Sequence, residues 1–256
     1  MREKIGGAVE MDVPKSYAAW RIFANAGMYV LMRLSLKLDL QGLEYIPRTG
    51  PLLVIINHNS FLDPLVPCVF VRNDMYPMAK AEALNHRLGF ALKWYGAFPV
   101  RRGEGDAGAL KTALRVLKAG HAMLMAPEGT RNPEGTLQEG HEGAALLAAL
   151  SHAPILPVSM RGGAPYLKNV KQLRRTPITM RAGKPLIVRS LEKKPTRDEL
   201  HAITDEMMYS LAALLPSEMR GRYADVDQFA PRYLLPYDTG ARQNFPKRNE
   251  VMPLMN

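Results

Sequence analysis

The chain has 256 residues, enough for one α/β domain with additional segments, and 47% of them are hydrophobic, which can fill a sizeable core. The formal net charge of +10 predicts an anionic partner. Basic residues are scattered, aromatic residues make up only 7%, and no RNA-binding signature is present, so the composition favours a membrane surface over nucleic acid.

The single cysteine excludes a structural disulfide within the chain and favours a reducing cytoplasm. Cys68 lies in the apolar run 65–71, which favours a core position over a nucleophile. The first residues, MREKIGGAVEMDVPK, contain no apolar run, so we expect no secretory signal.

Residues 16–38 are rich in large apolar side chains and could reach across a bilayer. Arg21, Asn25 and Arg33 make spanning costly. We expect an amphipathic helix that lies in the headgroup region and extends its basic side chains towards anionic phosphates. The pattern favours equally a helix packed on the protein's own core.

Strand-like and helix-like segments then alternate, which predicts an α/β fold with a mostly parallel central sheet flanked by helices. Gly120 is expected to end an amphipathic helix, and Thr196 with Glu199 forms a capping box at the start of another. We expect strands at 52–57, 76–80, 97–100, 122–126, 155–160, 178–180 and 186–188, and helices at 64–71, 85–94, 106–119, 142–150 and 196–215.

This pattern divides the chain into three parts. We expect residues 1–39 to be an N-terminal amphipathic helical segment for membrane association and residues 40–215 to be a single domain, whose motifs predict a catalytic role. Residues 216–256 form a C-terminal tail without a sustained period, which either wraps the domain or stays partly mobile.

The segment VIINHNSFLDP is the most informative in the chain. A buried strand is followed by His58, and Asp63 comes five residues later. Open α/β sheets bind their ligands at this end of their strands. A carboxylate that accepts the Nδ1–H of an imidazole leaves Nε2 free to take a proton. The pattern predicts a general base and the acid that orients it.

A structural reading of the same residues stays open on this segment alone. Asp63 and Pro64 would make a good helix start, and Asn57 and Ser60 could satisfy backbone donors at the strand end.

Further polar segments follow later predicted strands. FPVRRG places Arg101 and Arg102 after one strand, and PEGTR places an acid, a glycine, a hydroxyl and Arg131 after the next. Glycine permits close approach of a ligand to the backbone, and arginines bind phosphate oxygens. A base beside a phosphate site suits chemistry on a hydroxyl group of a phosphorylated molecule.

NHNSFLD resembles the NHxSxxD block of the glycerolipid acyltransferases, and FPVRRG, PEGTR and ILPV resemble their second, third and fourth blocks in the same order. The resemblance covers roughly residues 40–215 and is greatest for the 1-acylglycerol-3-phosphate acyltransferases of the bacterial PlsC type. It implies the α/β fold of that family, with a glycerol-3-phosphate acyltransferase-like catalytic domain.

The resemblance implies that His58 deprotonates the acceptor hydroxyl and that Asp63 holds the imidazole. The oxygen then attacks the thioester of an acyl-CoA or an acyl carrier protein, without an acyl-enzyme. No cofactor beyond that co-substrate is implied, and the setting is the cytoplasmic face of the cell membrane, with a peripheral or monotopic enzyme. Acceptor binding falls to Arg101, Arg102, Glu128, Gly129, Thr130 and Arg131, with Asn57, Ser60, Lys80 and Pro157 in support.

Some of these assignments leave alternatives. Arg101 stands where the family often has an acid, so either of the two adjacent arginines could make the main phosphate contact. Glu128 could anchor the arginines or meet an acceptor hydroxyl. Ser60 is expected to be structural, and Pro157 lies either in the acyl-side wall or in a plain core strand. The other histidines lack metal-ligand spacing, so we expect no metal site.

Competing functions are the same transfer to glycerol 3-phosphate, a lyso-ornithine lipid or a glycolipid, a thioesterase with water as acceptor, and a non-catalytic lipid-binding protein. The intact His58 and Asp63 count against the last, and the arginines would have no role in a thioesterase.

Overall fold

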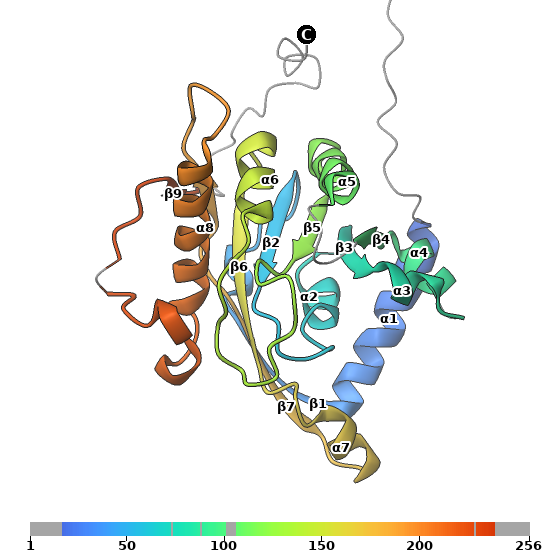
Figure 1. Cartoon of the computed structure of the whole chain (residues 1–256). Helices are drawn as coiled ribbons and strands as arrows, with labels where there is room; N and C mark the ends of the chain where they lie inside the picture. The colour runs from blue at the N-terminus through green and yellow to red at the C-terminus, as the bar shows by residue number, and fades with distance from the viewer. Residues whose placement is uncertain (1–16, 73, 88, 101–105, 228, 239–256) are drawn as a thin grey trace, which may run out of the picture.

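The computed structural model describes residues 17–238, apart from positions 73, 88, 101–105 and 228. Within these residues, nine strands form one sheet with helices on both faces (Figure 1). The strands are β1 (Leu36–Gln41), β2 (Leu52–Ile56), β3 (Met75–Lys80), β4 (Phe98–Val100), β5 (Ala122–Met125), β6 (Ile155–Arg161), β7 (Thr176–Ala182), β8 (Leu186–Val188) and β9 (Leu234–Pro236). The α-helices are α1 (Ala18–Ser35), α2 (Leu65–Phe70), α3 (Ala81–Asn85), α4 (Gly89–Tyr95), α5 (Ala107–Lys118), α6 (Gly143–Ser151), α7 (Tyr166–Lys171) and α8 (Arg197–Ala212), and the 3-10 helices are η1 (Leu43–Tyr45), η2 (Ser217–Met219) and η3 (Gly221–Tyr223).

The sheet is mostly parallel, as the sequence predicts. Its order is β1-β7-β6-β2-β5-β3-β4, with β8 beside β6 and β9 beside β8. Strand β2 is parallel to both β5 and β6, and β3 is parallel to both β4 and β5. In the described part of the chain, antiparallel pairs join β6 to β7 and β8, and β8 to β9. The carboxyl ends of β2, β5, β3 and β4 therefore lie along one edge.

Strand β2 is buried along its whole length because helices cover both faces of the sheet (Figure 1). Leu52, Val54 and Ile56 belong to the core that includes Met32 of α1 and Val66 of α2. Leu53 and Ile55 point to the other face and pack in the core formed with α5, α6 and α8. This double burial explains why the strand is a continuous apolar run instead of an alternating one.

Helix α1 is shorter than the sequence indicates. It ends at Ser35, and residues 36–41 form β1 parallel to β7, where we expected helix through residue 38. The alternating pattern LKLDLQ suits a strand, but the apolar residues of the preceding helix run directly into it. No helix among the described residues combines the length and the hydropathy needed to cross a bilayer.

Two polar residues of α1, Arg21 and Asn25, are buried against the protein, so the expected position of Arg21 among lipid phosphates is wrong, whereas Arg33 is exposed. The Arg21 guanidinium lies 4.7 Å from the ring centroid of Tyr76 and 5.7 Å from that of Tyr95. The Tyr95 hydroxyl donates a hydrogen bond of 2.8 Å to the Asn25 side chain. The aromatic rings can hold this cation in the interior through cation–π contacts.

The segment expected to be one helix at 85–94 contains a break. Helix α3 ends at Asn85, and α4 begins at Gly89. A Cβ atom at Gly89 would collide with the carbonyl group of Leu84, so a glycine is required where the two helices approach each other.

The described part of residues 216–238 wraps the domain, as one of our two expectations for this tail had it. Strand β9 pairs with β8, which extends the sheet. Glu206 on α8 is buried, and its carboxylate accepts hydrogen bonds of 2.6–2.9 Å from the backbone N–H groups of Arg232, Tyr233 and Leu234.

Candidate active site

The polar segments singled out in the sequence follow parallel strands at one edge of the sheet. His58 comes after β2, residues 126–131 come after β5, and Lys80 ends β3. Arg101 and Arg102 follow β4, but both lie outside the described residues. The edge is therefore the carboxyl end of the parallel strands, where α/β sheets bind ligands.

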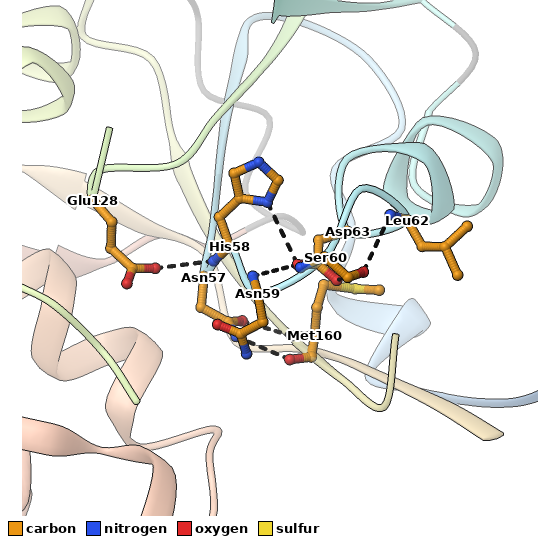
Figure 2. A network of polar contacts seen from close by, with 8 residues as sticks. All are labelled: Asn57, His58, Asn59, Ser60, Leu62, Asp63, Glu128 and Met160. Carbon is orange, nitrogen blue, oxygen red and sulfur yellow. Dashed lines mark hydrogen bonds and ion pairs between the residues drawn. The ribbon is translucent and has the colours of Figure 1, made fainter. Parts of the chain in front are cut away.

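His58 and Asp63 face each other across the turn that follows β2 (Figure 2). His58 Nδ1 lies 3.5 Å from Asp63 Oδ2, which is long for a hydrogen bond but short enough to tighten when a substrate binds. The Asp63 side chain is only 2% exposed, against 12% for the His58 side chain. Asp63 is therefore a buried partner for a histidine that keeps some access to solvent.

The Asp63 carboxylate is fixed by the turn itself. Its Oδ2 accepts hydrogen bonds of 2.6 Å from the backbone N–H groups of Asn59 and Ser60, and its Oδ1 accepts one of 3.0 Å from the Ser60 hydroxyl. The Ser60 hydroxyl oxygen also accepts the Leu62 N–H at 3.2 Å. Both bonds hold the Ser60 hydroxyl within the turn, which agrees with a structural and not a nucleophilic role.

Asn57 connects this turn to β6. Its amide group donates to the Met160 carbonyl at 2.9 Å and accepts the Met160 N–H at 2.7 Å (Figure 2). Ile56 is the last residue of β2 that pairs with β6. The Asn57 side chain extends this pairing, because it makes both hydrogen bonds to the backbone of Met160. The start of the turn is thereby anchored to the sheet.

The peptide groups of His58 are held by the segment that follows β5. Glu128 is buried, and its Oε1 accepts the His58 N–H at 2.9 Å, while its Oε2 accepts the Gln138 N–H at 3.0 Å. The Asn132 N–H donates to the His58 carbonyl at 2.8 Å. Burial raises the pKa of the Glu128 carboxyl, and the two backbone hydrogen bonds act against that rise.

Gly129, Thr130 and Arg131 are exposed at the same edge. Gly129 has φ +67°, and a Cβ atom there would lie 2.8 Å from the His141 ring, so the turn requires a glycine. The Arg131 side chain stands on the solvent side of a loop whose buried residue, Glu128, is bonded to His58. The loop thus presents a cation and open backbone beside the histidine.

Two of the predicted supporting residues have different surroundings. Lys80 is exposed at the end of β3. Pro157 is buried in the middle of β6, where its ring lies against Gly183 and close to Leu214. Of the two readings of Pro157, these contacts agree with the core strand.

Two contacts of the site were not found from the sequence. The first is the hydrogen bond from the Asn132 N–H to the His58 carbonyl. Every residue except proline has a backbone N–H, so the residue type at position 132 could not indicate this bond. A Cβ atom at Gly163 would collide with the Ser60 hydroxyl, and the glycine pair 162–163 directly after β6 is a signal that could have indicated this close approach. No cluster of three or more His, Cys, Asp and Glu side chains that could hold a metal is present in the part of the chain that the structure describes.

The chain is thus an α/β protein with a buried acid beside a histidine at the carboxyl edge of a mostly parallel sheet, an arrangement that would suit general base chemistry. Residues 37–161 match the family model described as Acyltransferase. The match includes the His58 turn and the loop that carries Glu128 and Arg131.

Individual relatives carry related names. The chain is 24% identical over 190 residues to a Bacillus subtilis protein named 1-acyl-sn-glycerol-3-phosphate acyltransferase. The aligned residues make up 73% of this chain and 92% of that protein. It is 29% identical over 129 residues to a chloroplastic protein of that name from Brassica napus. The aligned residues make up 49% of this chain and 38% of that protein. The chain thus spans little more than a third of the length of this plant relative.

The fold also has a solved counterpart. The crystal structure of the 1-acyl-sn-glycerophosphate acyltransferase PlsC from Thermotoga maritima superimposes with a TM-score of 0.55 and 21% identity, over 73% of this chain and 77% of that one. At this identity the likeness concerns the fold.

Proposed function

We propose that the protein transfers a fatty acyl group from a thioester to the free hydroxyl of 1-acylglycerol 3-phosphate, which yields phosphatidic acid. The observation that carries the proposal is the His58–Asp63 pair within the region that matches the Acyltransferase family model. The donor is an acyl-CoA or an acyl carrier protein, and the chemistry needs no cofactor besides that co-substrate.

In the proposed reaction, His58 acts through Nε2 because Nδ1 faces Asp63. Nε2 takes the proton of the acceptor hydroxyl while the oxygen attacks the thioester carbonyl carbon. The C–S bond then breaks, and the imidazolium returns the proton to the departing thiolate. The buried Asp63 carboxylate stabilises the imidazolium in between.

Acceptor recognition is assigned to the exposed loop that follows Glu128. Arg131 would bind the phosphate by charge-assisted hydrogen bonds, together with open backbone at Gly129 and Thr130 and with Arg101 and Arg102. The buried Glu128 takes a different role in the proposal. Both of its carboxylate oxygens accept backbone N–H groups, so we assign it to positioning His58.

An apolar cavity beside the His58 turn supports a lipid substrate. Its volume is about 100 Å³, and it lies between α1 and the turn. The residues that line it include Phe61 and Leu62, three and four positions after His58, together with Met28 and Leu31 of α1. An alkyl chain could pass here between the domain and the helix.

The outer face of α1 supports a position on the membrane. Phe23 is 70% exposed and Leu34 71% exposed, and Ile22, Val30 and Leu31 are also exposed. Large apolar side chains gathered on one exposed face indicate a binding surface. We propose that α1 lies in the interface of an anionic bilayer, at the cytoplasmic face of the cell membrane, as a peripheral or monotopic contact.

An assay with competing acceptors tests the reaction. We expect the wild-type chain, given an acyl thioester, to acylate lysophosphatidate faster than glycerol 3-phosphate, lyso-ornithine lipid or water. His58→Ala should lower turnover by at least about two orders of magnitude while the thermal unfolding temperature stays close to wild type, because only the general base is lost. Asp63→Asn should be nearly as damaging.

Each other outcome identifies a different function. Preference for another lipid acceptor would keep the mechanism and replace the substrate, and preference for water would indicate a thioesterase. Unchanged transfer by a folded His58→Ala chain would contradict the mechanism.

A further inference from the structure

The connection between β6 and β7 exposes apolar side chains at its end. It contains α7, which lies beyond the C-terminal end of α1 and beside β1 and β7 at the bottom of Figure 1. Leu167 is 62% exposed and Leu173 97% exposed, and Val170 is exposed between them. Leu167 and Val170 are three residues apart and so lie on one side of the helix. We call residues 166–174 the α7 tip.

The C-terminal turn of α7 holds Leu173 in a fixed outward position. Leu173 has φ +53°, a conformation that helix ends normally assign to glycine. Its N–H donates to the Val170 carbonyl at 3.0 Å, and the Arg174 N–H donates to the Asn169 carbonyl at 2.8 Å. These two bonds form a Schellman turn, so a leucine stands in a strained position where its side chain contacts water instead of the core.

The charges of the α7 tip all have one sign. Lys168, Lys171 and Arg174 are exposed beside the apolar side chains. No Asp or Glu occurs between residues 162 and 175. An apolar end surrounded by cations is complementary to a surface of anionic headgroups over a hydrocarbon layer.

The α7 tip is attached to both α1 and the His58 turn. Arg175, which directly follows the α7 tip, donates from its guanidinium to the carbonyl groups of Arg33 and Leu36 at the end of α1. Within the tip, the Tyr166 hydroxyl is hydrogen-bonded to the Ser35 hydroxyl at 3.3 Å. The Tyr166 ring also lies edge-on to Phe61 at 5.6 Å between centroids. The α7 tip is therefore held next to the C-terminal end of α1, where Leu34 is 71% exposed.

We propose that the α7 tip is a second membrane contact, which inserts Leu167, Val170 and Leu173 into an anionic bilayer beside α1. The proposal rests on the membrane position of α1 in the proposed function and adds a separate element to it. Two contacts fix the orientation of the domain, whereas a single helix would leave it free to roll about the helix axis. Through Phe61, the second contact brings the His58 turn to the interface.

Vesicle co-sedimentation of the full chain tests the proposal. Leu173→Gly removes the side chain and suits the positive φ, so it should not lower the thermal unfolding temperature. We expect it to weaken binding to vesicles of phosphatidylcholine with phosphatidylglycerol on the order of tenfold, because one buried leucine is lost. Leu167→Gln should act in the same direction. Leu235→Gln, at an exposed leucine on β9, is the matched control and should bind as wild type.

Several results would overturn the proposal. Wild-type vesicle affinity in Leu173→Gly would do so, as would an equal loss in the Leu235→Gln control. Slower transfer from an acyl carrier protein, with unchanged vesicle affinity, would instead identify a protein-docking surface. Vesicle binding is measured without turnover, so a chain that binds through Leu173 but shows no transferase activity would refute the proposed function alone.

Discussion

At the scale of single residues, the most consequential contact is the one between Glu128 and the backbone of His58. Asn132 holds the other side of the same residue through the His58 carbonyl. His58 and Glu128 are seventy positions apart in the sequence, yet this hydrogen bond joins their two segments. A shift of either segment would therefore displace the other.

This contact predicts different kinetic effects for two neighbouring residues of one loop. Glu128→Gln replaces one acceptor oxygen by an NH₂ group facing a backbone N–H, which should shift His58 and lower kcat on the order of a hundredfold. Arg131→Gln should instead raise the KM for the phosphorylated acceptor roughly tenfold to a hundredfold, through lost charge-assisted hydrogen bonds. Steady-state kinetics with varied lysophosphatidate separates the two.

Glu128→Asp is the control, because it keeps the carboxylate and should recover part of kcat. A raised KM with unchanged kcat in Glu128→Gln would mean that Glu128 contacts the acceptor instead of positioning the base.

The sequence was sufficient for part of this site. His58 and Asp63 could be found because the pair lies within one short turn after a recognisable buried strand. The hydrogen bond between Glu128 and His58 could not be predicted, because its donor is a backbone N–H of a distant segment and does not depend on the residue type there. Arg101 and Arg102 stay predictions, since both lie outside the described residues.

At the scale of elements, α1 has an unusual distribution of side chains. Its polar residues Arg21 and Asn25 are buried against Tyr76 and Tyr95, while Phe23 and Leu34 are exposed. One face of the helix packs on the domain core, as one of the two expectations drawn from the sequence had it. The other face is exposed, and its contact with a bilayer stays a proposal.

The two faces of α1 should respond differently to substitution. Phe23→Glu should weaken binding to anionic vesicles with little change in stability, because the side chain is 70% exposed and its ring contact is to the partly buried Trp20. Asn25→Ala should lower the free energy of unfolding by about 0.5–1.5 kcal/mol, because the Tyr95 hydroxyl loses its closer acceptor and keeps only the Cys68 carbonyl at 3.4 Å. Co-sedimentation and urea unfolding measure the two effects.

Loss of stability in Phe23→Glu, with wild-type vesicle binding, would identify that face as a packing surface. Point substitutions suit this test better than deletion of residues 1–38, because deletion would also remove the start of β1.

Most elements could be predicted because their burial leaves a recognisable pattern, a continuous apolar run in β2 and a helical period in the amphipathic helix α5. β1 was missed because it continues an apolar helix without a break in composition, and β9 because three residues give too short a pattern. The short strand β9 exists because long-range contacts hold it, including the bonds to Glu206.

At the scale of the whole molecule, an ion-pair cluster closes the edge of the sheet opposite to the site. Arg72 pairs with Asp74 and donates to the Gly50 carbonyl, and His121 lies 3.6 Å from Asp74. Asp74 and His121 directly precede β3 and β5, and Gly50 lies two residues before β2. Burial tends to raise the pKa of Asp74, but hydrogen bonds from His121 and Arg72 outweigh it and hold the pKa at about 2.

This cluster predicts a stability loss in acid. Because the folded pKa of Asp74 lies below its ordinary value of 3.8, its contribution is complete above that value and disappears as the pH falls towards about 2. We expect the free energy of unfolding of Asp74→Asn to be below wild type at pH 5 and to converge with it near pH 2. Urea unfolding between these limits measures both curves. A constant difference between the curves would show that the Asp74 charge is not responsible.

The Glu206 carboxylate makes the chain intolerant of trimming at its C-terminal side. If a protease or an early stop codon removed the segment from Arg232 onwards, this buried carboxylate would lose all three N–H donors that compensate its charge. Breaking a buried charge interaction of this kind costs about 3–5 kcal/mol, a large part of the stability of an ordinary domain. The nicked protein would become a substrate for cellular quality control, so the abundance of the protein depends on the short segment that adds β9 to the sheet.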